Sequence, residues 1–256
     1  STILGAILFL RFGFAVGTLG FWGALLLVMM GHAVTIPTAL AISELATNKR
    51  VEGGGEYFII SRSFGLNIGA TIGIALYLSQ AISVAFYIIA FTEAFEFLFS
   101  YFANSFSVIL PRQVISLPVT VVMGLIILRK GANTGLKTLY IVIGILFVSL
   151  LLFFFGHPVA GSAAQARIPA GDFRNMSDFF IVFAICFPAF TGMTAGVGLS
   201  GDLKNPARSI PVGTIVATFI GMLVYIGVIY KLTISASADD MLENQLIMSK
   251  IAIGGL

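Results

Sequence analysis

The sequence predicts an all-α membrane protein of about seven spanning helices, of which the first and the sixth are broken. Charged residues make up only 10% of the 256 residues, hydrophobic residues make up 58%, and the mean hydropathy is +1.04. In a soluble domain about a quarter of the residues are charged. Apolar runs of roughly 20 residues recur, and each is long enough to cross a hydrocarbon core about 30 Å thick as a helix. The runs lack the alternation of barrel strands, so we expect helices.

Seven apolar runs are expected to span the bilayer. They cover residues 2–19, 21–46, 65–101, 114–128, 136–156, 178–199 and 210–230. The third run is long enough to protrude or to tilt, and the fourth is short. The polar stretch 47–64 contains three consecutive glycines followed by EYFIISRS, which is typical of a short helix along the membrane surface.

Arginine and lysine gather in the loops that follow the even-numbered runs. These residues are Lys49, Arg50, Arg62, Arg129, Lys130, Lys137, Lys204 and Arg208. Because short cytoplasmic loops retain an excess of positive charge, those loops are predicted to be cytoplasmic. The odd-numbered helices then run outward.

The sequence gives no support for an enzyme. The two histidines, His32 and His157, are far apart, and Cys186 lies inside an apolar run, so neither a disulfide nor a metal cluster is indicated. Residues 53–55 lack the lysine and serine of a phosphate-binding loop. We expect no catalytic residue, no cofactor, no metal beyond a transported cation and no nucleic-acid partner.

The sixth run is expected to break near its centre, where residues 187–196 read FPAFTGMTAG. Pro188 lacks an N–H and clashes with the preceding turn, and Gly192 weakens what remains. The first run begins with TILGA, again with a glycine at its centre. Broken helices five spans apart suggest an inverted repeat whose breaks meet at the midplane, where carbonyls can hold a cation and helix N-termini an anion. A packing kink between small residues is the alternative.

Two charged residues lie inside predicted spans. Arg11 follows Thr2 by nine residues, or roughly 13 Å of helix, and Glu93 follows Tyr87 by six residues, or roughly 9 Å. Both lie outside the presumed midplane at compatible depths. Because an isolated charge is costly there, mutual pairing is expected, either as an outer gate or as a structural ion pair.

Four segments resemble the cation-chloride cotransporters of the amino acid, polyamine and organocation superfamily. ILGAILFLRFGFAVGTLG is similar to the first helix of that family, VEGGGEYFIISRSFG to its inner-loop signature and SVAFYIIAFTE to its third helix. FPAFTGMTAGVGLSGDLKNPARSIPVGT is similar to the sixth helix and the loop that follows, and it is the most specific of the four.

This resemblance implies a five-plus-five inverted-repeat transporter fold, in a prokaryotic-type member of the family or a fragment of one. Ser1 opens directly into an apolar helix, and the last residues, IAIGGL, stop where another helix can begin. Residues 1–256 are therefore expected to be one transmembrane transport domain, truncated to about seven helices. The N-terminal half of the first helix and the helices from the eighth onward are expected to be missing.

The resemblance also implies the site residues. For potassium these are the carbonyls of Thr2, Ile3, Pro188 and Thr191 with the hydroxyl of Tyr87. For chloride they are the backbone of Gly5, Ala6, Ile7, Gly192, Met193 and Thr194. Arg11 and Glu93 match the outer-gate pair of the family.

The sequence departs from the family pattern at several of these positions. Thr2 stands where animal members commonly have Asn, Leu4 replaces a frequent Trp beside the sodium position, and Met193 and Thr194 alter the surroundings of one chloride. The eighth helix, which supplies the sodium hydroxyls in the family, lies beyond Leu256. Sodium coupling therefore stays open.

The function expected from the resemblance is electroneutral symport of potassium with chloride by alternating access, in a multi-pass protein of the cell membrane. The expected partners are the lipid bilayer and small inorganic ions, and a homodimer of the complete protein stays open. An amino-acid permease of the same fold is the alternative within the superfamily, although Tyr87 favours ions. A non-transporting membrane scaffold or fragment is the alternative from a different class.

Overall fold

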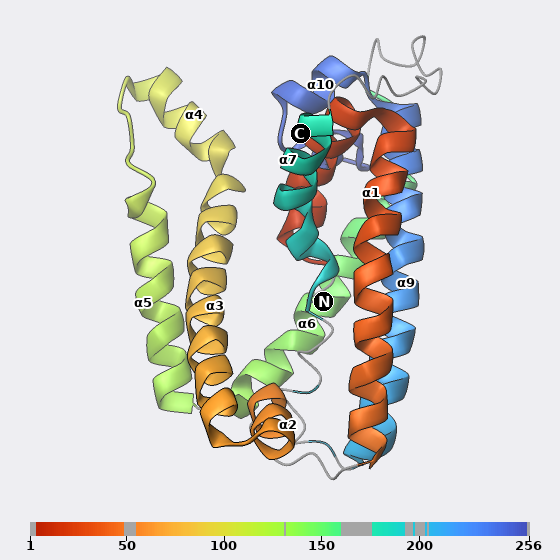
Figure 1. Ribbon diagram of the computed structural model, residues 1–256. Helices are drawn as coiled ribbons and strands as arrows, with labels where there is room; N and C mark the ends of the chain where they lie inside the picture. Colours follow the sequence, from red (N-terminus) through yellow and green to blue (C-terminus); the bar gives the residue numbers. More distant parts are fainter. Residues whose placement is uncertain are drawn as a thin grey trace. The chain divides into compact units, whose positions relative to one another are not determined.

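The computed structural model describes residues 4–48, 55–130, 132–159, 176–192, 197, 203 and 205–254, and every regular element within them is a helix (Figure 1). The elements are α1 (Ala6–Asn48), α2 (Gly55–Phe64), α3 (Leu66–Glu93), α4 (Glu96–Phe106), α5 (Gln113–Lys130), α6 (Ala132–Phe154), α7 (Met176–Cys186), the 3-10 helix η1 (Phe187–Phe190), α9 (Pro206–Ser235), α10 (Ala238–Glu243) and α11 (Ile247–Ile251). The prediction of an all-α fold is confirmed for these residues.

Helix α1 contains the first two predicted spans. Its backbone leaves the helical conformation at Gly20, which has a φ of 68° and a ψ of −177°, and the chain turns back at this point (Figure 1). A positive φ is strained for any residue with a Cβ but not for glycine. The predicted boundary between residues 19 and 21 is therefore confirmed, and a single glycine makes the turn.

The remaining apolar helices account for the other predicted spans. By length and composition, the helices at Ala6–Thr47, Leu66–Glu93 and Pro206–Ser235 can cross a membrane. Shorter apolar helices occupy Gln113–Arg129, Tyr140–Phe154 in α6, and Met176–Phe190, which covers α7 and η1. With α1 divided at Gly20, each predicted run has a helical counterpart, which confirms a multi-pass membrane protein.

The prediction of one continuous third span is wrong. Helix α3 ends at Glu93, and α4 begins at Glu96 after a tight turn in which the Phe95 N–H donates to the Thr92 carbonyl over 3.0 Å. Both helices are apolar, so hydropathy alone did not reveal the turn between them. The predicted short helix in the polar stretch 47–64 is confirmed as α2.

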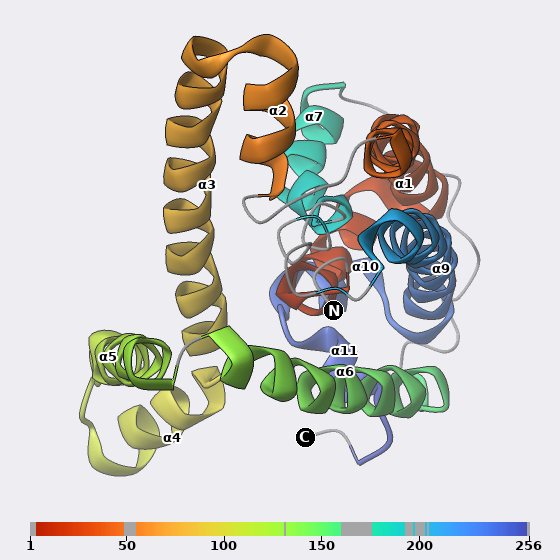
Figure 2. The same ribbon diagram turned by 90° about the horizontal axis from the view of Figure 1, so that it is seen from below.

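The chain forms two compact units, one made of Ser1–Ile74 with Ser149–Leu256 and the other of Ala75–Val148. In the first unit α9 runs alongside α1, as both views show (Figures 1 and 2). Thr214, Thr218 and Gly221 are among the buried residues of α9. Small residues such as these let membrane helices approach closely.

The first half of α1 packs against α10 and α11. A Cβ added at Gly13 would lie 2.6 Å from the Ile247 Cγ2, and one added at Gly17 would lie 3.1 Å from the Met241 Cβ. These two glycines therefore allow the close approach of the segment that follows α9.

In the second unit, an exposed ion pair joins α4 to the segment before α5. The Arg112 Nη2 lies 3.1 Å from the Glu96 Oε2, and both side chains are more than half exposed.

Candidate functional site

The sixth predicted span is broken at Pro188. Helix α7 ends at Cys186, the chain tightens into η1, and Thr191 has an extended backbone with a φ of −80° and a ψ of 179°. Gly192 follows with a φ of 96°. Because proline cannot donate to the preceding turn, the helix cannot continue through it unchanged. The predicted break is confirmed. Gly192 adopts a positive φ, which is strained for residues that carry a side chain.

Two of the residues predicted to bind potassium, Pro188 and Thr191, are hydrogen-bonded to each other at this break. The Thr191 Oγ1 donates to the Pro188 carbonyl over 2.7 Å, and the Thr191 N–H donates to the same carbonyl over 3.3 Å. The Thr191 side chain is exposed. Its hydroxyl oxygen keeps its lone pairs while its proton is donated. The Pro188 carbonyl therefore accepts two hydrogen bonds from Thr191, in the local pattern that hydroxyl side chains commonly form with the backbone.

Three predicted chloride residues form the first turn of α1. The helix begins at Ala6, and the Leu8 N–H donates to the Gly5 carbonyl over 3.1 Å. The N–H groups that precede Leu8 belong to the first turn, in which backbone donors lack partners inside the helix. Together with the helix dipole, these donors attract an anion. Gly5, Ala6 and Ile7 are therefore placed where anion binding by the backbone is favourable.

The first helix and the break are in contact within the first unit. The rings of Phe12 and Phe190 meet edge to face with centroids 6.2 Å apart. The Cys186 thiol lies 4.0 Å from the Arg11 carbonyl oxygen. Two segments that the sequence places 175 residues apart are thus adjacent.

Residues that the sequence reasoning missed surround the Phe190 ring. Tyr225 of α9 lies with its ring centroid 5.1 Å from that of Phe190, and its hydroxyl donates to the Ala189 carbonyl over 2.9 Å. The His32 ring lies 5.3 Å from the Phe190 ring. A Cβ added at Gly31 would lie 2.6 Å from the Phe190 Cε2. A tyrosine in an apolar run signals that its hydroxyl needs a partner, but the sequence does not identify the partner.

The other predicted site residues that the structure describes outside the first turn of α1 and the break are divided between the two compact units. Tyr87 and Glu93 belong to α3 in the second unit, and 49% of the Tyr87 side chain is exposed. Arg11 belongs to the first unit. The potassium role of Tyr87 and the gate formed by Arg11 and Glu93 therefore stay predictions.

Four predicted ligands lie outside the described residues: Thr2, Ile3, Met193 and Thr194.

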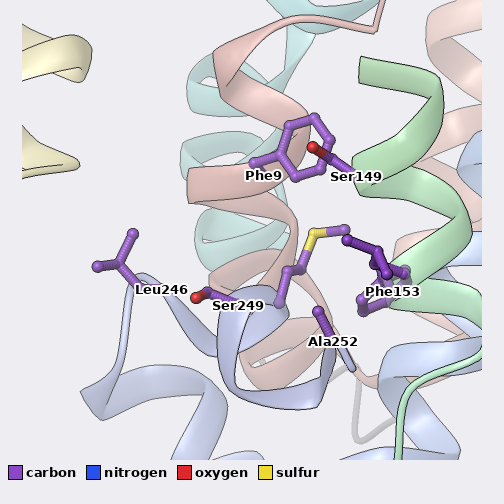
Figure 3. A pocket seen from close by; sticks show the side chains of 8 residues that line it. Phe9, Ser149, Phe153, Leu246, Ser249 and Ala252 are labelled. Atoms are coloured by element: carbon purple, nitrogen blue, oxygen red, sulfur yellow. The ribbon is translucent and has the colours of Figure 1, made fainter. Parts of the chain in front are cut away.

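A separate cavity of about 300 Å³ opens between α1, α6 and the segment around α11 (Figure 3). Its lining is mostly apolar, with the hydroxyls of Ser149 and Ser249 among side chains such as Phe9 and Phe153. None of its lining residues is a predicted ion ligand. Among the described parts of the chain, no group of three or more His, Cys, Asp or Glu side chains is placed to hold a metal.

The sequence can be compared with known proteins. The family model of the amino acid permeases matches residues 1–253. Solute carrier family 12 member 2 from Homo sapiens is 36% identical over 242 residues, which are 88% of this chain and 20% of the relative. Member 2 from Squalus acanthias is 34% identical over 241 residues, again 88% of this chain and 20% of the relative.

A second member of the same carrier family is equally similar. Solute carrier family 12 member 1 from Mus musculus is 36% identical over 241 residues, 88% of this chain and 22% of the relative. The chain thus spans about a fifth of the length of these curated relatives. All three are solute carriers rather than enzymes. The resemblance to the cation-chloride cotransporters is thereby confirmed, and the chain, a multi-pass protein of the cell membrane, belongs to the amino acid permease family.

Proposed function

We propose that the complete protein moves potassium and chloride together across the membrane as a secondary symporter with alternating access. The observation that carries this proposal is the break in the sixth span, where the helix ends at Phe190, Thr191 is extended and Gly192 has a φ of 96°, because transporters bind ions at such interruptions of membrane helices. The identity of 36% to solute carrier family 12 member 2 over most of the chain supports the same class of cargo. Sodium coupling stays open in this proposal.

The cation half of the site needs more oxygens than the carbonyls of Pro188 and Thr191. A desolvated cation is stable only where several oxygens replace its hydration shell. The carbonyls of Thr2 and Ile3 and the hydroxyl of Tyr87 are the proposed additional ligands. The phenol oxygen would then be the one side-chain ligand in a site otherwise built from carbonyls.

The anion half of the site uses backbone donors. The first turn of α1 offers the N–H groups of Gly5, Ala6 and Ile7, and the dipole of the helix that runs from Ala6 to the turn at Gly20 adds to their attraction for chloride. Gly192, with Met193 and Thr194, is proposed to contribute a second set of backbone contacts. Because one anion balances one cation, the loaded site can cross the membrane without moving net charge through the membrane potential.

Alternating access is proposed to follow from the broken helices. In inverted-repeat transporters, one helix bundle rocks against the other around a site at the midplane. The charges of Arg11 and Glu93 are proposed to close the outer side of that site when they pair.

A second candidate function has one specific observation in its favour, since the matching family model is that of the amino acid permeases. In that case the first turn of α1 would hold a substrate carboxylate, and the oxygens of Pro188 and Thr191 would hold its ammonium. Uptake of labelled rubidium and of labelled amino acids by the complete protein separates the two functions. Chloride-dependent rubidium uptake supports the ion symporter, and amino-acid uptake without it supports the permease.

The substitution Tyr87→Phe tests the potassium site, since it keeps the ring and removes only the oxygen. If the oxygen binds the cation, the half-saturating rubidium concentration rises severalfold or more at normal membrane expression. If the hydroxyl only bonds a neighbouring helix, about 1 kcal/mol of stability is lost and ion affinity stays the same. Tyr77→Phe is the matched control, because Tyr77 is on the same helix and is 73% exposed. Unchanged rubidium affinity and unchanged chloride-dependent flux in Tyr87→Phe would remove Tyr87 from the site.

A further inference from the structure

The break in the sixth span is bonded by a side chain from another helix. Tyr225 lies in the interior of α9 and is fully buried, with an exposure of 0%. Its hydroxyl donates to the Ala189 carbonyl over 2.9 Å. A buried tyrosine hydroxyl needs a partner, and a carbonyl released by a helix break needs a donor, so this one bond satisfies both.

In the sequence, the bonded Ala189 carbonyl lies between Pro188 and Thr191, the two residues proposed to bind the cation at the break. Ala189 directly follows Pro188 and precedes Thr191 by two residues. The carbonyl of Ala189 is bonded to α9, whereas the carbonyl of Pro188 is bonded locally by Thr191. Because the peptide group is planar, fixing the Ala189 carbonyl fixes the orientation of the whole peptide unit between the two oxygens.

The donor itself has little freedom to move. The Tyr225 ring stacks on Phe12 with centroids 4.8 Å apart and an interplanar angle of 27°. It also meets Phe190 at 5.1 Å and 72°. Phe190 in turn fills the space left by the missing side chain of Gly31. Two spans of α1, the break and α9 thus hold the hydroxyl in one place, which is the condition for a preorganised site.

We propose that Tyr225 is a positioning residue for the substrate site, which acts by holding the Ala189 carbonyl so that the oxygens of Pro188 and Thr191 keep their binding geometry. This inference rests on the proposed function only in locating the substrate at the break. It applies to a cation and to a substrate ammonium alike, because both would be bound by the same two oxygens.

The test is Tyr225→Phe in the complete protein, with rubidium and labelled amino acids first measured on the unmodified protein. The substrate that the unmodified protein carries is then used for all variants in reconstituted vesicles. The half-saturating concentration does not depend on the amount of protein in the vesicles, so reduced expression does not obscure it. We expect Tyr225→Phe to raise the half-saturating concentration by about threefold or more and to change the maximal rate per molecule less.

Two control variants on α9 separate positioning from stability. Tyr230→Phe makes the same chemical change at a position that is 53% exposed. Thr233→Val removes a buried hydroxyl whose bond, to the Ile229 carbonyl at 2.8 Å, stays within the helix. Both are expected to keep the half-saturating concentration of the unmodified protein, and Thr233→Val is expected to lower the melting temperature as Tyr225→Phe does.

Several results would overturn the assignment of Tyr225. One is an unchanged half-saturating concentration in Tyr225→Phe, whatever its melting temperature. Another is an equal rise in Thr233→Val, since that would trace the effect to stability. Failure of Tyr225→Phe to fold while Thr233→Val folds would also count against it, because the hydroxyl would then be structural. Amino-acid uptake in place of rubidium uptake would reject the proposed ion symport and leave the comparison of variants intact.

Discussion

Gly156 lies at a junction where a small side chain is required. It follows α6, and the backbone around Ile251 passes directly against it. A Cβ added at Gly156 would lie 2.7 Å from the Ile251 carbonyl carbon and 2.9 Å from the Ala252 Cα, and it would overlap the Ile251 carbonyl oxygen. Backbone atoms cannot rotate out of the way as a side chain can. We therefore expect Gly156→Ala to push the segment of α11 away from α6.

The cost can be estimated from the bonds that depend on this contact. The Ile253 N–H donates to the Leu152 carbonyl over 3.0 Å, and the Lys231 Nζ donates to the Gly156 carbonyl over 2.8 Å. A neutral hydrogen bond contributes about 1 kcal/mol, and a bond from a charged group about 1.5–3 kcal/mol. Loss of both would cost about 2.5–4 kcal/mol, from which about 0.5–1 kcal/mol is recovered because alanine restricts the unfolded chain more than glycine does. The expected net loss is about 1.5–3.5 kcal/mol.

Unfolding of the purified protein in detergent measures this loss. The matched control is Gly144→Ala in α6, where an added Cβ meets nothing within 4 Å. We expect the control to be neutral or to gain up to about 1 kcal/mol from helix propensity. Lys231→Met removes one of the two bonds, so its loss should be intermediate. If Gly156→Ala were as stable as Gly144→Ala, the close approach at this junction would be refuted.

Three further predictions concern charge and orientation. Glu96→Gln should lower the free energy of unfolding by less than about 1 kcal/mol, because its bond to Arg112 is exposed to solvent; a loss above 2 kcal/mol in a denaturation experiment would contradict this. Reversing both Arg11 and Glu93 should restore part of the rubidium uptake lost on reversing either one, and a double variant no better than the worse single one would argue against a direct pair. A cysteine at Asn205, on the side predicted to be cytoplasmic, should resist impermeant thiol reagents in intact cells and react after permeabilisation, and rapid labelling of intact cells would reverse the predicted orientation.

Some of these elements could be predicted from the sequence because single residues decide them. Pro188 has no backbone donor, so the break follows from its chemistry, and it occurs where the sequence predicts it. Gly20 separates two apolar runs, and the structure turns at that residue. In both cases the local preference of the backbone and the hydropathy pattern agree, which is the condition under which sequence reasoning succeeds.

Other elements depend on contacts between distant segments. The turn at residues 94–95 divides a run that is apolar on both sides, so no change of hydropathy marks it. The bond from Tyr225 to Ala189 joins residues 36 positions apart. The need for glycine at position 156 arises from the backbone of Ile251, which the sequence does not place beside it. Side-chain partners across helices are fixed by tertiary packing. The sequence therefore locates the candidate site by its helix break, but it does not identify the residues of other helices that support the break.

The turn at Gly20 bears on how the first two spans enter the bilayer during synthesis. No Asp, Glu, Lys or Arg lies between Arg11 and Glu44, and one residue joins the two helices. No polar loop has to be carried through the hydrocarbon layer, so the transfer cost of that step is small. Because a single residue joins the two spans, the linker is too short for the first span to move into the bilayer while the second stays in the translocation channel. The two spans are therefore expected to leave the translocation channel as a preformed pair.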